Sequence, residues 1–200
     1  MSTTIYNCNA ILDQAIFKNI ANLQGYSAND ISEWNGIYTG KYKTLINVPI
    51  SIASALAASS VPALTAAYTN GKKEAVRSQI NTAIRFIMVV AFPCAVGMGV
   101  LASPILQLLF RDSSELAASM LQLGAVSIVF FSLSTLSNGL LQGINRMREP
   151  VKNALIALVL HIGLLVVLMC VFKLNIYAVV YANAFFGLLM CVLNLSLIHI

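Results

Sequence analysis

The sequence has 200 residues, of which 58% are hydrophobic and 10% are charged. Soluble domains carry roughly 25% charged residues, so a mean hydropathy of +0.82 argues against a soluble bundle and indicates a polytopic membrane protein. The formal net charge of +5 does not indicate a nucleic-acid partner. Its Lys and Arg residues gather at the ends of apolar segments, where membrane topology and snorkelling place them.

Residues 5–23 form the first predicted helix. Its apolar positions are interrupted by Asn, Asp, Gln and Lys, so it is too polar for a helix that faces lipid on all sides. We expect its polar side to meet other helices or water. Asp13 has two interpretations that stay open: a carboxylate exposed near the end of the helix, or a group that handles substrate or an ion.

Residues 24–40 are rich in Gly, Asn, Asp and Ser and are predicted to form an outer loop, with Trp34 as an anchor at the membrane interface. The residues after Ser27 also fit a short capped helix. The first membrane span is predicted at residues 42–68, because about 20 apolar helical residues cross the hydrocarbon core.

Pro49 and Pro62 lie inside this first span, and each removes a backbone donor, so we expect a bent helix that packs against its neighbours. Gly97 and Gly99 in the second span favour close packing or a helix break. The later spans are predicted at residues 82–110, 116–143, 151–172 and 176–198. The sequence therefore predicts an all-α transmembrane bundle of about six helices. Because it begins within a helix and ends directly after a span, we expect it to be part of a longer protein.

Lys and Arg concentrate in the loops after the first and third spans, from Lys72 to Arg77 and from Arg146 to Lys152. The loops after the second and fourth spans each hold a single basic residue, Arg111 and Lys173. Alternation of spans places the two basic loops on the same side of the membrane. The positive-inside rule assigns that side to the cytoplasm, so we predict that Arg111 and Lys173 lie outside.

The sequence carries no catalytic constellation: no Ser/His/Asp set, no paired carboxylates and no glycine-rich phosphate loop. We therefore predict that it is not an enzyme. The cysteines lack a Cys-x-x-Cys pair and a histidine at ligand spacing, so we predict small buried side chains and neither a metal nor another cofactor. They are Cys8, Cys94, Cys170 and Cys191. His161 lies in the middle of a span, where it suits a hydrogen bond between helices or, alternatively, a proton relay.

Small and polar side chains recur at helical spacing on three predicted spans. They are Asn47, Ser51, Ser54, Ala58 and Thr65 on the first span, Ser127, Ser134, Asn138 and Asn145 on the third, and Asn183, Gly187 and Asn194 on the fifth. Such stripes suit either tight helix packing or a water-filled transport path, and both stay open. In either case we expect Asn47 and Asn138 to point into the bundle or toward a partner lobe, since an unpaired amide is costly in hydrocarbon.

Five segments carry a resemblance to a known family. They are residues 42–50 (YKTLINVPI), 60–64 (SVPAL), 71–73 (GKK), 92–106 (FPCAVGMGVLASPIL) and 138–146 (NGLLQGINR). In this order they resemble the polysaccharide-biosynthesis flippases, which include the stage V sporulation protein B type. These belong to the multidrug/oligosaccharidyl-lipid/polysaccharide exporter superfamily. The resemblance covers nearly the whole chain, roughly residues 5–195.

The resemblance implies a two-lobed transporter of about fourteen helices, of which residues 1–200 would be a partial membrane transporter domain in the second lobe. It implies that alternating access moves a lipid-linked oligosaccharide or polysaccharide precursor across the cytoplasmic membrane. The implied partners are membrane lipid, the lipid-linked sugar and the first lobe of the same transporter. The related lipid II flippases carry an Asp-Arg pair just before the first span. This sequence has Lys43-Thr44 there, so the resemblance favours the sporulation and capsule-type branch.

A pyrophosphate-linked sugar needs a polar, cationic, water-filled cavity. Lys41 and Lys43 are the candidates for its anionic head, with interfacial snorkelling as the alternative. The other candidates for the substrate path are Asn47, Ser51, Ser54, Asn138 and Gln142, and Asp13 and His161 are the candidates for an ion or proton. The competing functions are a cation-coupled multidrug antiporter of the same superfamily and a non-transporting membrane scaffold subunit. The antiporter would need an acidic residue deep in its cavity, for which Asp13 is the candidate.

Overall fold

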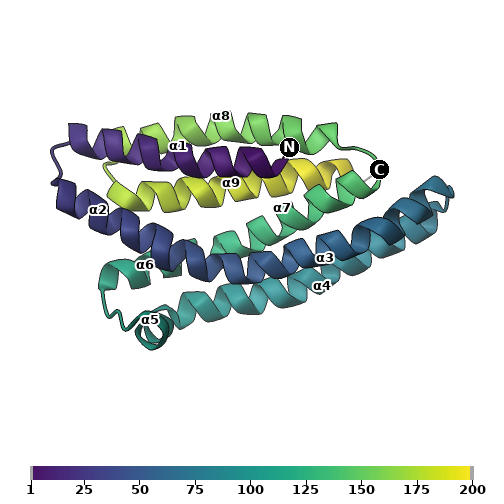
Figure 1. The fold of residues 1–200 in the computed structure, drawn as a ribbon, viewed down its shortest axis with the longest axis horizontal. Coiled ribbons are helices and arrows are strands. Elements are labelled where there is room, and N and C mark those ends of the chain that lie inside the picture. The colour runs from purple at the N-terminus through teal and green to yellow at the C-terminus, as the bar shows by residue number, and fades with distance from the viewer. Residues whose placement is uncertain (1, 199–200) are drawn as a thin grey trace.

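The computed structural model describes residues 2–198, with side chains described for residues 9–197, and this part of the chain consists of helices and short turns (Figure 1). The elements are α1 (Ser2–Leu23), α2 (Ala28–Ile37), the π-helical turn η1 (Tyr38–Tyr42), α3 (Lys43–Thr69), α4 (Lys73–Val100), α5 (Ala102–Phe110), α6 (Glu115–Gly124), α7 (Val126–Gly143), α8 (Arg148–Cys170) and α9 (Asn175–Ile198). Among the described residues, five helical stretches are long and apolar enough to cross a membrane. The predicted all-α transmembrane bundle is confirmed.

The central helix of the bundle is α7, which packs against α3, α4 and α9. The helix α9 also packs against α8, and α1 lies along α8 (Figure 1). Of the 18 residues of α7, 67% are buried inside the described bundle, whereas only 22% of the most apolar 18-residue stretch of α4 is buried. The helices α7 and α9 are therefore interior helices, and α4 presents a broad apolar face to its surroundings.

The predicted outer loop at residues 24–40 is wrong. Within that range only residues 24–27 are non-helical, and α2, η1 and α3 form one continuous helical stretch. The alternative of a short capped helix is confirmed, because the Ser27 side chain accepts a hydrogen bond from the backbone N–H of Asp30 at 3.2 Å.

A buried apolar face explains why this glycine-containing segment is helical. Ile31, Ile37, Tyr38 and Tyr42 are all buried, at the spacing of one helix face. The π-helical turn η1 shifts the phase of this face by one residue before α3 begins. Such turns are rare inside helices and are frequent at functional sites.

The span predicted at residues 82–110 is divided into α4 and α5 at Leu101. Pro104 explains the division, because it lacks the N–H that would bond the Val100 carbonyl in a continuous helix. Of the two alternatives predicted around Gly97 and Gly99, close packing or a helix break, the structure therefore shows the helix break.

The span predicted at residues 116–143 is divided into α6 and α7 at Ala125. Next to the division, the buried ring of Tyr42 lies directly against the bare backbone of Gly124. A Cβ built on Gly124 would lie 2.2 Å from the Tyr42 ring. A glycine at this point allows η1 to approach the interior helices closely.

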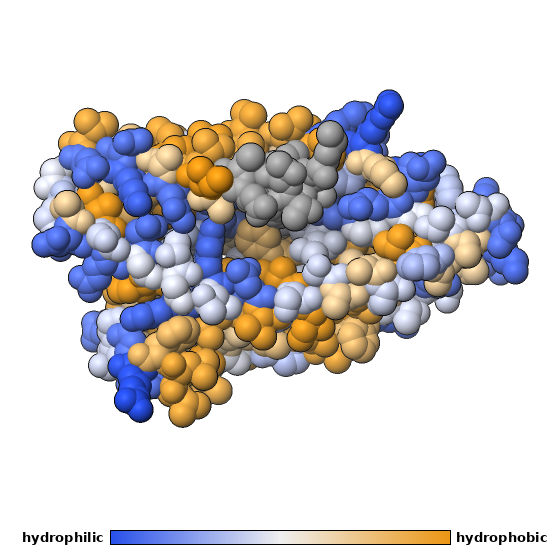
Figure 2. All heavy atoms as spheres, in the orientation of Figure 1, coloured by the Kyte–Doolittle hydropathy of each residue, from blue (hydrophilic) through white to orange (hydrophobic). Residues whose placement is uncertain are grey.

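The two predicted basic loops lie at the same end of the bundle. The α3–α4 and α7–α8 turns are at the right in Figure 1, and the α1–α2, α5–α6 and α8–α9 turns are at the left. Between these ends, hydrophobic atoms gather over α8 and over the edge formed by α4 and α5 (Figure 2). Large apolar side chains are exposed on these helices, among them Val89 of α4, Leu108 of α5 and Val159 of α8. Apolar sides between loop-bearing ends fit a bilayer, so this is a multi-pass membrane protein.

Candidate functional site

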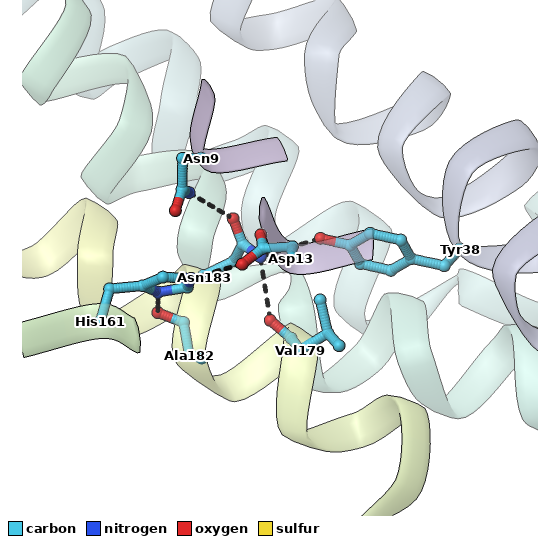
Figure 3. Close-up of polar contacts among 7 residues, drawn as sticks. All are labelled: Asn9, Asp13, Tyr38, His161, Val179, Ala182 and Asn183. Carbon is cyan, nitrogen blue, oxygen red and sulfur yellow. Dashed lines mark hydrogen bonds and ion pairs between the residues drawn. The ribbon is translucent and has the colours of Figure 1, made fainter. Parts of the chain in front are cut away.

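A buried polar cluster joins α1, α8 and α9 (Figure 3). Asp13 of α1 and His161 of α8 are 1% and 0% exposed. Asp13 Oδ1 lies 2.5 Å from His161 Nε2, and His161 Nδ1 lies 2.8 Å from the Ala182 carbonyl oxygen of α9. The predicted hydrogen bond of His161 between helices is confirmed. The exposed alternative for Asp13 is wrong, because α1 packs along α8 and encloses the carboxylate.

Asn183 of α9 connects this pair to η1. Its amide nitrogen donates to Asp13 Oδ2 at 2.7 Å and to the Tyr38 hydroxyl at 2.9 Å, and its amide oxygen accepts from Asn9 at 3.5 Å. Lys43 lies beyond Tyr38, with Nζ 5.1 Å from the centre of the Tyr38 ring. The cluster therefore links the interior helices to the start of α3.

A second buried polar layer lies about three turns along α9 from Asn183. Asn153 of α8 donates to Asn194 Oδ1 at 2.8 Å, and Asn194 donates to Asn138 Oδ1 of α7 at 2.7 Å. All three side chains are buried. At these positions the polar stripes of the third and fifth predicted spans hold helices together, which is the packing alternative.

Lys41 has an anionic partner within the chain. Its Nζ lies 2.5 Å from Asp112 Oδ2 in the α5–α6 turn, where the two side chains are 29% and 15% exposed. Asp112 Oδ1 also accepts the backbone N–H of Ser114 at 2.9 Å. The hydrogen bond from Lys41, and after it the one from Ser114, lowers the pKa of Asp112 from its ordinary value of 3.8. The pair ties η1 to the α5–α6 turn.

The polar stripe of α3 faces away from the described bundle. Asn47, Ser51 and Ser54 are exposed, whereas Ala57 is buried against α7. The prediction that Asn47 points into this bundle is therefore wrong. Its second form, that Asn47 faces another part of the transporter, stays a prediction.

At the far end of this stripe, Thr65 contacts α7, whereas the earlier stripe residues are exposed. Thr65 donates to the Gly143 carbonyl of α7 at 2.9 Å, so it serves as a contact between helices. Gln142, next to Gly143, is exposed. The stripe thus combines one packing residue with a longer exposed segment.

A shallow polar groove lies at the first turns of α4, at the basic end of the bundle. It is lined by Glu74, Arg77, Ser78, Asn81, Thr82 and Arg85. Arg77, Asn81 and Arg85 recur every four residues, so one ridge of the helix presents two guanidinium groups with an amide between them. Guanidinium groups suit phosphate oxygens, a role that the topology prediction for the Lys72–Arg77 loop does not include.

The prediction of buried cysteines is confirmed for Cys191 and wrong for Cys170, which is exposed at the end of α8. Cys94 is partly buried, and the side chain of Cys8 lies outside the described ones. Within the described residues, no group of three or more His, Cys, Asp or Glu side chains could hold a metal ion.

Three members of the polar layers were not among the predicted site residues: Asn9, Asn153 and Tyr38. For Asn9 a signal existed, because it lies four residues before Asp13 and so on the same helix face. Helical spacing gave no comparable signal for Tyr38, because the π-helical turn η1, which contains it, shifts which residues share a face of the helix.

Comparison with known proteins gives the family. The family described as "Lipid II flippase MurJ" matches residues 41–198. The lipid II flippase MurJ of Bacillus subtilis (strain 168) is 29% identical over 131 residues, which cover 64% of this chain and 24% of that protein. The probable lipid II flippase MurJ of Bdellovibrio bacteriovorus is 28% identical over 160 residues, which cover 76% of this chain and 30% of that protein. No solved structure matches.

The chain thus spans between 24% and 30% of the length of these relatives. The predicted superfamily is confirmed, whereas the narrower sporulation-type and capsule-type branch is not. With 158 of its residues matched, from 41 to 198, the chain belongs to the MurJ lipid II flippase family.

Proposed function

We propose that the whole protein moves a lipid-linked saccharide precursor across the cytoplasmic membrane by alternating access, with this chain as part of its second lobe. The exposed amide of Asn47 carries the proposal. It lies in a 42-residue helical stretch, Ala28–Thr69, that is apolar enough to cross a membrane. The neighbouring Ser51 hydroxyl is satisfied by the Val48 carbonyl of its own helix at 2.6 Å, so it would tolerate lipid. An amide facing hydrocarbon would be costly, so Asn47 is best placed on a water-filled path shared with another lobe.

The proposed substrate class is a lipid whose sugar head is joined through pyrophosphate. Lipid II is the first member to test, because both relatives are named for it. A polysaccharide precursor, which Lys43-Thr44 favours, is the second. The proposed phosphate partners are Lys43, near one end of the α3 stripe, and Arg77 and Arg85, near the other end of the bundle. Lys41 is a weaker candidate because Asp112 already neutralises it.

The path would include Asn47, Ser51, Ser54 and Gln142, all of which are exposed in the described bundle. Asn138 is better assigned to packing, because it accepts a hydrogen bond from Asn194. We further propose that the end carrying the α3–α4 and α7–α8 turns faces the cytoplasm, on the strength of its Lys and Arg residues.

The test uses the full-length protein in proteoliposomes loaded with lipid II or, separately, with a lipid-linked polysaccharide repeat unit. Asn47→Leu should strongly reduce the flipping rate and leave thermal stability unchanged. Val48→Leu is the matched control: it is adjacent and 58% exposed, and it should keep both properties. If Asn47→Leu instead lowers stability by about 1 kcal/mol, with flipping lost in proportion to unfolding, the stripe is a packing surface. Failure of the wild-type protein to move either precursor would refute the proposed transport and favour the scaffold alternative.

A further inference from the structure

The helix α5 lies across the end of the bundle. Figure 1 shows α5 end-on, whereas the long helices run along the length of the bundle. Its nine residues span about 14 Å, well short of the roughly 30 Å of a hydrocarbon core. The helix α5 therefore does not cross a membrane, and its axis lies near the membrane plane.

The side chains of α5 form three faces, because successive residues are rotated by about 100° around a helix. One face packs against the bundle and consists of Ala102, Leu106 and Phe110. A second face is polar and consists of Ser103 and Gln107. The third face is apolar and consists of Pro104, Ile105, Leu108 and Leu109. On this third face Leu108 and Leu109 are 83% and 60% exposed, so α5 carries an exposed apolar flank beside a polar one.

The apolar and hydrophilic surfaces at α5 are ordered along the length of the bundle. At the α5 corner, at the lower left in Figure 2, hydrophobic atoms lie toward the middle of the bundle and hydrophilic atoms toward its end. The exposed apolar surface of α4 leads up to this corner through Val96, Val100 and Leu101. A bilayer has the same order, with hydrocarbon toward the middle and headgroups and water toward the end.

The residues around α5 also suit a membrane interface. Arg111 directly follows α5, is exposed and forms no ion pair within the described part of the chain. An unpaired guanidinium suits the phosphate of a lipid headgroup. At the same end of the bundle, the rings of Tyr26 and Trp34 pack edge to face with their centres 5.2 Å apart. Such amphipathic aromatic rings gather at the level of the headgroups.

We propose that α5 docks on the lipid bilayer as an interfacial helix, with its Leu108 flank in the upper acyl chains and its Gln107 flank in the headgroup layer. In the proposed orientation this is the outer leaflet. The occupant is lipid, because the apolar flank continues the exposed apolar surface of α4 and the neighbouring Arg111 has no carboxylate partner. The docking does not depend on the proposed transport.

Docking of α5 would connect the bilayer surface to η1. Asp112 lies two residues after the end of α5 and pairs with Lys41 of η1. A helix held at a fixed depth in the leaflet therefore fixes the height of Asp112, and through Lys41 it positions the start of α3. The lipid contact of α5 thus sets where the 42-residue helical stretch enters the membrane.

Spin labelling of the full-length protein in phospholipid nanodiscs tests this docking. In a cysteine-free background, single cysteines replace Leu108, Gln107, Val89 in the middle of α4, and Ser113 in the α5–α6 turn. All four side chains are exposed, so the labels can be accommodated without repacking. Power saturation compares collisions of each label with oxygen, which concentrates in hydrocarbon, and with a water-soluble nickel chelate. The comparison gives the depth of each label.

We expect the Leu108 label about 5–10 Å inside the headgroup boundary, the depth typical of an interfacial helix. The Val89 label should be deeper, because Val89 lies about 18 Å along α4 from Leu101. The Ser113 label should be in water, and the Gln107 label should lie between those of Ser113 and Leu108. The Leu108 depth should stay the same in Asp112→Asn, because the leucine flank and not the ion pair holds α5 in lipid.

Five results would overturn the proposal. A Leu108 label that meets the nickel chelate as often as the Ser113 label faces water. A Leu108 label that meets neither reagent is covered by protein, either another part of the transporter or a partner. Equal depths at Leu108 and Gln107 would mean that the two flanks do not face different layers. A Leu108 label as deep as that at Val89 would make α5 part of a span, and loss of its depth in Asp112→Asn would mean that Lys41 positions α5 instead of lipid.

Discussion

Replacing Gly139 with Ala should force apart α3 and α7, the pair of helices with the most extensive contact in the described bundle. A Cβ built on Gly139 would lie 2.7 Å from the Ala57 Cβ. Carbon atoms in contact prefer about 3.5–4.0 Å, so the helices would have to separate by about 1 Å at this point. Both atoms are attached to helical backbone, and no rotamer change relieves the overlap. We expect destabilisation of about 1–3 kcal/mol, the usual cost of overpacking.

Thermal unfolding of the purified full-length protein measures this effect. Gly163→Ala is the matched control, since its Cβ would meet nothing within 4 Å and alanine favours a helix. Adding Ala57→Gly to Gly139→Ala should restore much of the stability, because the nearest remaining Ala57 backbone atoms, at 3.5 and 3.7 Å, are at ordinary contact distance. If Gly139→Ala unfolds at the same temperature as Gly163→Ala, or if Ala57→Gly restores nothing, the close approach of α3 and α7 is not as described.

Three further predictions follow from the polar contacts and the loops. Asn194→Leu should lower thermal stability by about 1 kcal/mol, because it removes two buried amide hydrogen bonds worth about 0.6 kcal/mol each in a membrane. Since the pKa of Asp112 is lowered, its pair with Lys41 stabilises the fold above the ordinary value of 3.8 and is lost as pH falls below it. Asp112→Asn should therefore remove part of the acid sensitivity seen in unfolding curves. In a cysteine-free background, single cysteines replacing Lys72 and Arg148 should resist a membrane-impermeant thiol reagent in intact cells, whereas one replacing Asp112 should react; labelling at Lys72 would contradict the proposed orientation.

The sequence predicted the membrane bundle well, because spans depend on a local property, the length of an apolar helix. The loop prediction at residues 24–40 failed for a physical reason. Composition there is typical of turns, but Ile31 and Ile37 bury an apolar face that local composition does not reveal. The division at Leu101 follows from Pro104, a local feature of the sequence, whereas the division at Ala125 lies next to a tertiary contact, the Tyr42 ring against Gly124.

The candidate site was predictable in part. Asp13 and His161 stood out as ionisable residues in apolar helices, where such groups are expensive and need partners. Their contact with each other joins residues 148 positions apart, so no local pattern could indicate it. The stripe on α3 was predictable as a pattern, but its direction was not, because spacing defines a face without saying what the face contacts.

The contacts of η1 hold the start of α3 against the rest of the described bundle. Within five residues, η1 makes three polar contacts to separate parts of the bundle: Tyr38 accepts from Asn183 of α9, Lys41 pairs with Asp112, and the Tyr42 hydroxyl lies 3.4 Å from the Ser127 hydroxyl of α7. The α3 residues beyond it approach α7 closely where Ala57 meets Gly139 and Leu64 meets Gly143. Movement of α3 relative to α7 and α9 would therefore have to rearrange these three contacts. The buried cluster of Asp13, His161 and Asn183 lies against one of them, because Asn183 donates both to Asp13 and to the Tyr38 hydroxyl.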